Sequence, residues 1–172
     1  MPRHISFVFP GQGSQSMGML DRIDPAYINH FRPKVDSALD LDLIEIIKHG
    51  PIEKLNRSSI TQPAILLTSY LLYKDLLSKI NIEPDIICGH SLGEYTALVV
   101  GNSIDLEEAL KLVHKRGLLM EECNEGSMYA ILNCDLLTIS KFCDEVSNKT
   151  KKIVSPANIN SPNQIVIAGN ID

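Results

Sequence analysis

The chain has 172 residues, 44% of them hydrophobic, so it can bury the core of one domain or of one domain and the start of another. Its formal net charge of −5 and the lack of a basic stripe with interleaved aromatics argue against nucleic acid as a partner. No run approaches about 18 apolar residues, and no charged region followed by an apolar one opens the chain. We therefore expect an intracellular, cytoplasmic protein with no membrane attachment.

The first half of the chain predicts strands that alternate with helices. In chain order we expect a buried strand at 5–9, an amphipathic helix at 42–49, a long helix at 63–80, a short central strand of the parallel type at 86–88 and a helix at 92–100. Pro63 suits the first turn of the long helix, because that position has no intrahelical partner for an N–H group. The alternation indicates an α/β fold with a parallel sheet.

The second half predicts one more helix and then a change of pattern. Asp105 and Glu108 form a capping box that opens a helix at 105–122. Beyond Gly126 we expect a strand at 127–133, a helix at 137–147, a charged linker at 148–152 and a strand at 164–168. The sequence thus divides into residues 1–125 and a smaller part, 126–172.

A G-x-S-x-G turn stands between the strand at 86–88 and the helix at 92–100. Gly89 and Gly93 leave room for a sharp turn that lifts the Ser91 hydroxyl above the strand end. The helix that follows directs its free N–H groups to the same point, and the N–H of Leu92 is the natural first donor to an oxyanion. We interpret Ser91 as a nucleophile, although such a turn can also occur without any chemistry.

Other kinds of site find little support in the sequence. The five histidines are scattered, and no H-E-x-x-H or Cys/His cluster predicts a metal. The glycines of the loop at 11–18 do not fit G-x-G-x-x-G, so no dinucleotide site is expected. The four cysteines show no C-x-x-C pair and no disulfide spacing, so we expect reduced thiols.

Four motifs in the same order resemble those of malonyl-CoA:acyl carrier protein transacylases, the acyltransferases of fatty acid and polyketide synthesis. They are G-H-S-L-G-E-Y at 89–95, F-P-G-Q-G-S-Q at 9–15, L-V with R-G at 112–117, and A-N-I-N-S-P at 157–162. The resemblance spans essentially all 172 residues and matches the N-terminal portion of the family. It implies a hydrolase-like core at 1–125 and, at 126–172, the beginning of an inserted ferredoxin-like subdomain, with the C-terminal remainder of both absent.

Arg116 lies on the apolar stripe of the helix at 105–122, where a guanidinium needs anionic or carbonyl partners. The residues alone leave open an arginine tied to Glu94, to Glu121 or to helix-end carbonyls. The resemblance instead implies that Arg116 binds the free carboxylate of a malonyl group. Leaving that arginine unpaired when acetyl is bound would create selectivity.

The resemblance also assigns roles to three further residues. The N–H of Gln12 becomes the second oxyanion donor beside Leu92, although a glutamine in a glycine-rich loop is by default only a polar turn residue. His90 is implied to contact substrate and not to act as the base, because neighbours along a turn point in different directions. The resemblance implies that Asn160 lies on the substrate side of the junction between the core and the subdomain. Without the resemblance, Asn160 is interpreted as a turn asparagine before Pro162.

The implied reaction is a two-step acyl transfer. Ser91 attacks malonyl-CoA, coenzyme A leaves a malonyl-serine intermediate, and the phosphopantetheine thiol of acyl carrier protein takes the malonyl group. Malonyl-CoA is a substrate, no cofactor is bound permanently, and the complete enzyme is expected to be a monomer. Lys149, Lys151 and Lys152 could assist docking of an acidic carrier, or form a solvated loop.

The family places its general base in a histidine beyond the position of Asp172. A serine without its base loses ~10²–10⁴-fold or more in rate, so we expect this chain alone to be weak or inactive.

Two other classes of protein stay open. An α/β-hydrolase thioesterase or esterase shares G-x-S-x-G but needs no Arg116. A non-enzymatic fragment would be inert or would pair with a separate C-terminal piece.

Overall fold

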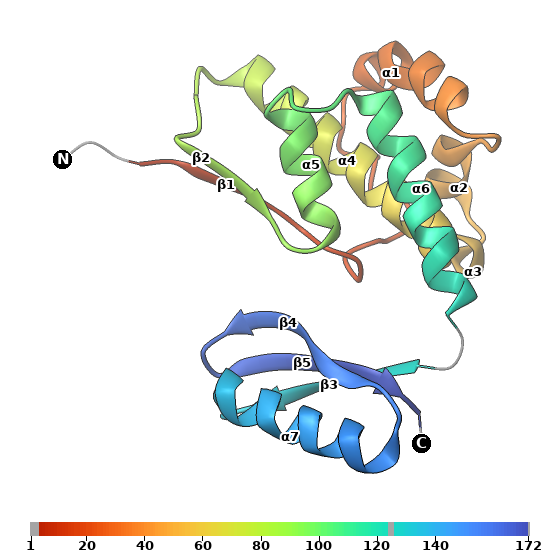
Figure 1. Ribbon diagram of the computed structural model, residues 1–172. Coiled ribbons are helices and arrows are strands. Elements are labelled where there is room, and N and C mark those ends of the chain that lie inside the picture. The colour runs from red at the N-terminus through yellow and green to blue at the C-terminus, as the bar shows by residue number, and fades with distance from the viewer. Residues whose placement is uncertain (1–3, 124–125, 172) are drawn as a thin grey trace. The chain divides into compact units, whose positions relative to one another are not determined.

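The computed structural model describes residues 4–123 and 126–171. Two compact units make up the chain, Met1–Glu122 and Cys123–Asp172 (Figure 1). Among the described residues, no helix combines the length and the apolar character that crossing a membrane requires.

The first unit joins a small parallel sheet to a set of packed helices. Its elements are β1 (Ser6–Phe9), α1 (Pro25–Ala38), α2 (Leu43–His49), α3 (Ile52–Leu55), α4 (Ser58–Lys79), β2 (Ile86–Gly89), α5 (Leu92–Val100) and α6 (Leu106–Glu122). Strands β1 and β2 pair in parallel, with Ser6 opposite Ile86 and Phe9 opposite Gly89. The mixed α/β fold with a parallel sheet is thus confirmed.

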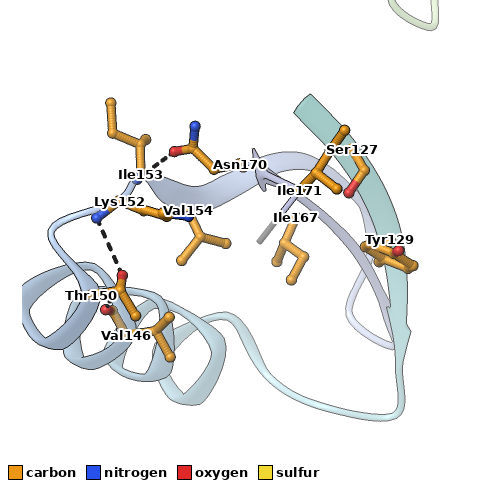
Figure 2. A pocket seen from close by; sticks show the side chains of 11 residues that line it. Ser127, Tyr129, Val146, Thr150, Lys152, Ile153, Val154, Ile167, Asn170 and Ile171 are labelled. Atoms are coloured by element: carbon orange, nitrogen blue, oxygen red, sulfur yellow. Dashed lines mark hydrogen bonds between the residues drawn. The ribbon is translucent and has the colours of Figure 1, made fainter. Parts of the chain in front are cut away.

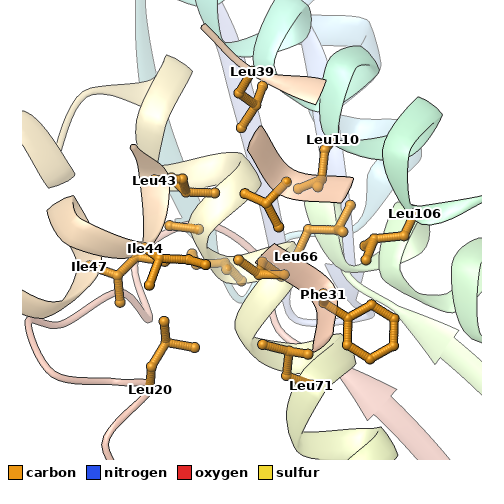
Figure 3. Close-up of a cluster of buried hydrophobic side chains, with 14 of the residues drawn as sticks. Leu20, Phe31, Leu39, Leu43, Ile44, Ile47, Leu66, Leu71, Leu106 and Leu110 are labelled. Carbon is orange, nitrogen blue, oxygen red and sulfur yellow. The ribbon is translucent and has the colours of Figure 1, made fainter. Parts of the chain in front are cut away.

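The core of the first unit lies between its helices rather than beneath its sheet. Side chains from α1, α2, α4 and α6 meet in one buried cluster, which includes Phe31, Ile47, Leu66 and Leu110 (Figure 3). Helix α4 is the centre of this arrangement, since it contacts α1, α2, α3, α5 and α6. The long apolar run of α4 is therefore buried on several sides.

The structure corrects the predicted start of the long helix. Helix α4 begins at Ser58, five residues before the expected position, and Pro63 stands inside it. The helix tolerates this proline because the carbonyl of Ser59, which loses its intrahelical amide, contacts Nδ1 of His114 instead. A partner that is distant in sequence thus overrides a local stop signal.

The prediction that the sheet strands are buried is wrong for several side chains. Val8 of β1 is 69% exposed and Ile86 of β2 is 56% exposed, whereas Phe9 is buried. β2 pairs only with β1 among the described strands, so it is not a central strand here. The helices cover the sheet incompletely, which leaves apolar side chains open to solvent.

Other elements match the prediction or were missed by it. Asp105 accepts the N–H of Glu108 at 3.0 Å, as expected of the cap of α6. Helix α1 was missed because Pro33 interrupts its pattern, although Asp24 and Pro25 are a recognisable N-terminal signal.

The second unit is a three-stranded antiparallel sheet with one helix. Its elements are β3 (Gly126–Leu132), α7 (Leu136–Thr150), β4 (Val154–Ser161) and β5 (Gln164–Asn170), and the strand order is β3-β5-β4. Ile139, Cys143 and Ile165 form its small buried cluster. β4 was not predicted, since Pro156 and its asparagines disfavour strands; its place at the sheet edge accommodates them.

A surface pocket opens in the second unit between α7 and the sheet (Figure 2). Val146 and Thr150 line it from the helix, and Tyr129 and Ile167 line it from the strands. The Ile153 N–H donates to Asn170 Oδ1 at 2.9 Å along its rim. None of the residues predicted for catalysis or substrate binding lines this pocket, although Lys152, predicted for carrier docking or a solvated loop, does.

Candidate active site

The turn at Ser91 has the strained backbone expected of an exposed nucleophile. Ser91 has φ 53° and ψ −109°, a conformation that non-glycine residues rarely adopt. A Cβ on Gly89 would overlap the backbone of Gly93, and a Cβ on Gly93 would overlap the carbonyl of Phe9. Both positions therefore need glycine, because β1, β2 and α5 approach one another too closely for a side chain.

Leu92 is the first residue of α5, directly after Ser91. The first amides of a helix have no acceptor within that helix, so they can serve a ligand. The neighbouring amides of Gly93 and Glu94 close the turn by donating to the carbonyls of His90 and Ser91 at 2.9 and 3.1 Å. The oxyanion role of the Leu92 N–H stays a prediction.

Arg116 reaches the turn from α6. Its Nη2 donates to Ser91 Oγ at 3.1 Å, and its Nη1 donates to Gln62 Oε1 at 2.7 Å. The guanidinium carbon lies 5.8 Å from the centre of the Tyr95 ring, within cation–π range. Two residues 25 positions apart in sequence, Ser91 and Arg116, thus meet at one site.

One of the two acids that the sequence offered as a partner for Arg116, Glu121, is engaged elsewhere. Glu121 binds Arg57 at 2.9 Å and accepts the N–H of Ser59 at 2.7 Å. Burial raises the pKa of the Glu121 carboxyl, but the hydrogen bonds from Ser59 and Arg57 outweigh it, and the pKa lies below its ordinary value. Glu121 therefore stays ionised and holds the start of α4.

Gln62 was missed by the sequence reasoning. It is 0% exposed on α4, accepts from Arg116, and its Nε2 lies 3.2 Å from Met120 Sδ and 3.5 Å from Gln12 Oε1. Its signal in the sequence was a polar residue directly before the apolar run at 63–67, next to Pro63. A buried amide of this kind keeps its position only when its partners are also fixed.

Gln12 lies in the loop after β1 and joins the same network. Its Nε2 donates to Ser58 Oγ at 3.0 Å, and its Oε1 faces Gln62. The structure therefore connects Gln12, Gln62, Arg116 and Ser91 in one chain of polar contacts. The predicted role of the Gln12 N–H as an oxyanion donor is a separate matter and stays a prediction.

The two remaining predicted residues fall in different units. The His90 N–H donates to Phe9 O at 3.2 Å, and the His90 ring stands over Gly11, whose added Cβ would lie 3.2 Å from Nδ1. Asn160 lies on β4 of the second unit, where its Nδ2 donates to Gln164 Oε1 at 3.0 Å. Their roles in substrate binding stay predictions.

Metal ligation has no support from the described parts of the chain. Across residues 4–123 and 126–171, no group of three or more His, Cys, Asp or Glu side chains is arranged to hold a metal ion. The contact that the structure shows at the turn is the one between Ser91, with its strained backbone, and the guanidinium of Arg116.

A strained serine on the turn between a parallel strand and a helix is the arrangement that presents a nucleophile in enzymes with a hydrolase-like fold. Residues 6–172 match the family model described as an acyl transferase domain, and the chain belongs to that family. The resemblance inferred from the sequence motifs is thereby confirmed.

Curated relatives and solved structures agree with this assignment. The malonyl CoA-acyl carrier protein transacylase of Escherichia coli K12 is 42% identical over 169 residues, which are 95% of this chain and 54% of that protein. The transacylase of Haemophilus influenzae is 41% identical over 174 residues, 97% of this chain and 55% of that protein. The chain thus spans about half the length of the curated relatives it matches.

Two solved structures extend the comparison to the fold. The transacylase from Coxiella burnetii superposes with a TM-score of 0.88 at 40% identity and covers 99% of this chain and 55% of its own. A malonyl-transacylase in complex with a type II PKS acyl-carrier protein gives a TM-score of 0.86 at 40% identity, covering 98% and 56%.

Proposed function

We propose that this chain supplies the nucleophile and the carboxylate-binding arginine for transfer of a malonyl group from malonyl-CoA to acyl carrier protein. The observation that carries the proposal is the contact between Arg116 Nη2 and Ser91 Oγ at 3.1 Å, with Nη1 held by Gln62. A guanidinium this close to a serine can bind the distal carboxylate of an acyl group attached to that serine. The identity of the relatives as transacylases supports the same reaction.

The proposed chemistry runs in two balanced steps. Ser91 Oγ attacks the thioester carbonyl, the C–S bond breaks, and coenzyme A leaves as a thiol while the malonyl group becomes an ester of Ser91. The carrier's phosphopantetheine thiol then attacks that ester, the acyl C–O bond breaks, and the malonyl group becomes a thioester of the carrier while the Ser91 hydroxyl is regenerated. In both steps the N–H groups of Leu92 and Gln12 stabilise the oxyanion, and Arg116 holds the malonyl carboxylate. His90 and Asn160 contribute to substrate binding.

The proton of Ser91 needs an acceptor, and Arg116 cannot provide one, because a guanidinium is protonated throughout the working pH range. We place the base, as in the family, in a histidine outside this 172-residue sequence. The chain alone is therefore expected to react slowly or not at all. On this proposal residues 1–125 form the N-terminal part of a hydrolase-like core, and 126–172 form part of a ferredoxin-like subdomain.

The intact mass of the purified chain tests the proposal directly. After incubation with malonyl-CoA we expect a slow, substoichiometric adduct of malonyl size, absent in Ser91→Ala and much weaker with acetyl-CoA. Equal labelling by acetyl-CoA would remove the role assigned to Arg116. A malonyl adduct that persists in Ser91→Ala would remove the role assigned to Ser91.

A second candidate is supported by the exposed apolar surface of the sheet. Val8 and Ile86 are more than half exposed, and apolar grooves flank β1 and β2. The curated relatives extend beyond the part that this chain matches, and this surface fits further polypeptide of the kind that continues in them, in the same chain or in a separate one. Co-expression with the C-terminal half of the Escherichia coli relative, followed by a transacylase assay, distinguishes such a complex from a self-sufficient chain.

A further inference from the structure

Helix α4 has a structural defect one turn from the candidate site. In an α-helix the N–H of residue i donates to the carbonyl of residue i−4, so the carbonyl of Ser59 would normally be served by residue 63. Residue 63 is proline and has no N–H. Ser59 is only 2% exposed, so solvent has little access to it. An unpaired carbonyl there would be costly.

His114 on α6 satisfies this carbonyl. Its Nδ1 lies 2.7 Å from Ser59 O. Because a carbonyl oxygen only accepts hydrogen bonds, Nδ1 must carry a proton and act as the donor in this contact. The two residues are 55 positions apart, so this bond is a contact between helices and not a local cap.

Two further residues on the same face of α6, Gly117 and Glu121, also contact α4 at Ser59. Glu121 accepts the N–H of Ser59 at 2.7 Å. Between them, Gly117 lets the helices approach so closely that an added Cβ would lie 2.5 Å from Ser58 O and from Ser59 Cα. Residues 114, 117 and 121 share one helical face. Together they fix both backbone polar groups of Ser59.

The contacts of α6 with Ser59 lie close to the hydrogen bond that orients Arg116. Gln62 follows Ser59 by three residues on α4, and Arg116 follows His114 by two on α6. The 2.7 Å bond between Gln62 Oε1 and Arg116 Nη1 therefore depends on how α4 is set against α6. A shift of the α4 backbone at Ser59 would move the amide that aims the guanidinium at Ser91.

We infer that His114 is a positioning residue: by supplying the hydrogen bond that Pro63 cannot make, it holds Gln62 against Arg116 and so sets the site's selectivity for acyl groups that carry a carboxylate. The claim about selectivity rests on the proposed function. The claims about the His114–Ser59 hydrogen bond and its effect on Arg116 are independent of that function, and they can be tested without any turnover.

A double-mutant cycle tests whether His114 and Pro63 act on the same carbonyl. His114→Ala in the natural background should raise the unfolding equilibrium constant about tenfold, the usual value of a hydrogen bond to a buried group. In the Pro63→Ala background, where residue 63 regains its N–H, the same change should raise it less than threefold. Equal effects in both backgrounds would overturn the assignment.

The proton position and the arginine give two spectroscopic readouts. Nitrogen-15 NMR of the His114 ring should show the Nδ1–H tautomer, and an Nε2–H tautomer would contradict the proposed bond. The side-chain N–H signals of Arg116 should be protected from exchange in the unaltered chain and in His114→Gln, whose amide can still donate. In His114→Ala they should lose at least fivefold in protection, and unchanged protection would refute positioning.

Acylation of Ser91 tests the consequence for selectivity. We expect His114→Ala to reduce the preference for malonyl-CoA over acetyl-CoA at least fivefold, with His114→Gln restoring most of it. Lys115→Ala, at an exposed neighbouring position, should leave the preference unchanged and serves as the control. If the unaltered chain gives no adduct, the preference is measured on the chain co-expressed with the C-terminal half of the Escherichia coli relative, and absence of acylation there refutes the proposed function. The cycle and the Arg116 signals decide the role of His114 in either case. An unchanged preference in His114→Ala would refute its role in selectivity.

Discussion

The two units of this chain hold their structure together in different ways. In the first unit a large buried cluster extends through α1, α2, α4 and α6, and it encloses polar groups such as Gln62. In the second unit the buried cluster is Ile139, Cys143 and Ile165, with one helix on one sheet. A strained serine and a buried amide are stable only where the surrounding packing is extensive, and the first unit provides it.

Helix capping shows the same contrast. In the second unit Asp135 caps α7 through Thr138, three residues away. In the first unit Glu121 of α6 caps α4 through Ser59, 62 residues away. The first unit also caps α6 locally, through Asp105, so the contrast concerns α4, the helix that carries Gln62. The position of Gln62 therefore depends on how α4 and α6 are set against each other.

The largest effect is expected from adding a methyl group at the turn. Gly93→Ala would overlap the Phe9 carbonyl, so we expect a loss of about 4 kcal/mol in stability and no acylation of Ser91. Gly126→Ala in the second unit is the matched control, since its Cβ would stand 3.3 Å from Gly169 O. Chemical denaturation measures both, and a fully stable Gly93→Ala would contradict the close approach.

A cavity in either core comes next. Leu66→Ala, at a fully buried position in the first unit, should cost about 3 kcal/mol in unfolding free energy. Ile139→Ala, in the smaller cluster of the second unit, should cost less, because its surroundings are more open to solvent. Hydrogen exchange should likewise show weaker amide protection in the second unit. Equal costs and equal protection would remove the contrast between the cores.

Arg116→Lys changes the geometry of the site while keeping the charge. Two nitrogens of the planar Arg116 guanidinium donate to Ser91 and Gln62, and the single ammonium group of a lysine lacks this geometry. Malonylation of Ser91 should therefore slow roughly 10- to 100-fold. The rate with acetyl-CoA should change much less. Mass spectrometry over time measures both rates, and an equal loss for the two acyl groups would argue against carboxylate binding.

The smallest effect concerns pH. The hydrogen bonds from Ser59 and Arg57 keep the folded-state pKa of Glu121 below the ordinary 4.5. Its stabilisation is therefore fully present above that value and is lost as the pH falls through the folded pKa. Glu121→Gln should cost about 1 kcal/mol at pH 7 and flatten this acid dependence. Unfolding curves from pH 7 down to about 3 measure it, and an unchanged slope would refute the assignment.

Much of the fold and part of the site follow from local sequence. The strand, the G-H-S-L-G turn and α5 form a continuous segment in which glycine spacing and helix onset are set by neighbouring residues. The cap of α6 by Asp105 and the strands β3 and β5 were predictable for the same reason. The motifs also indicated the acyltransferase family, to which the chain belongs.

The sequence by itself thus determined the position of Ser91 in its turn, because steric limits on backbone angles act between adjacent residues. Only the tertiary structure decided what stands beside it. Gln62 and Arg116 are 54 positions apart and Ser59 and His114 are 55 apart, and nothing local to either residue specifies the other. Those pairs exist because the apolar faces of α4 and α6 pack together, and that packing brings the polar groups between them into contact.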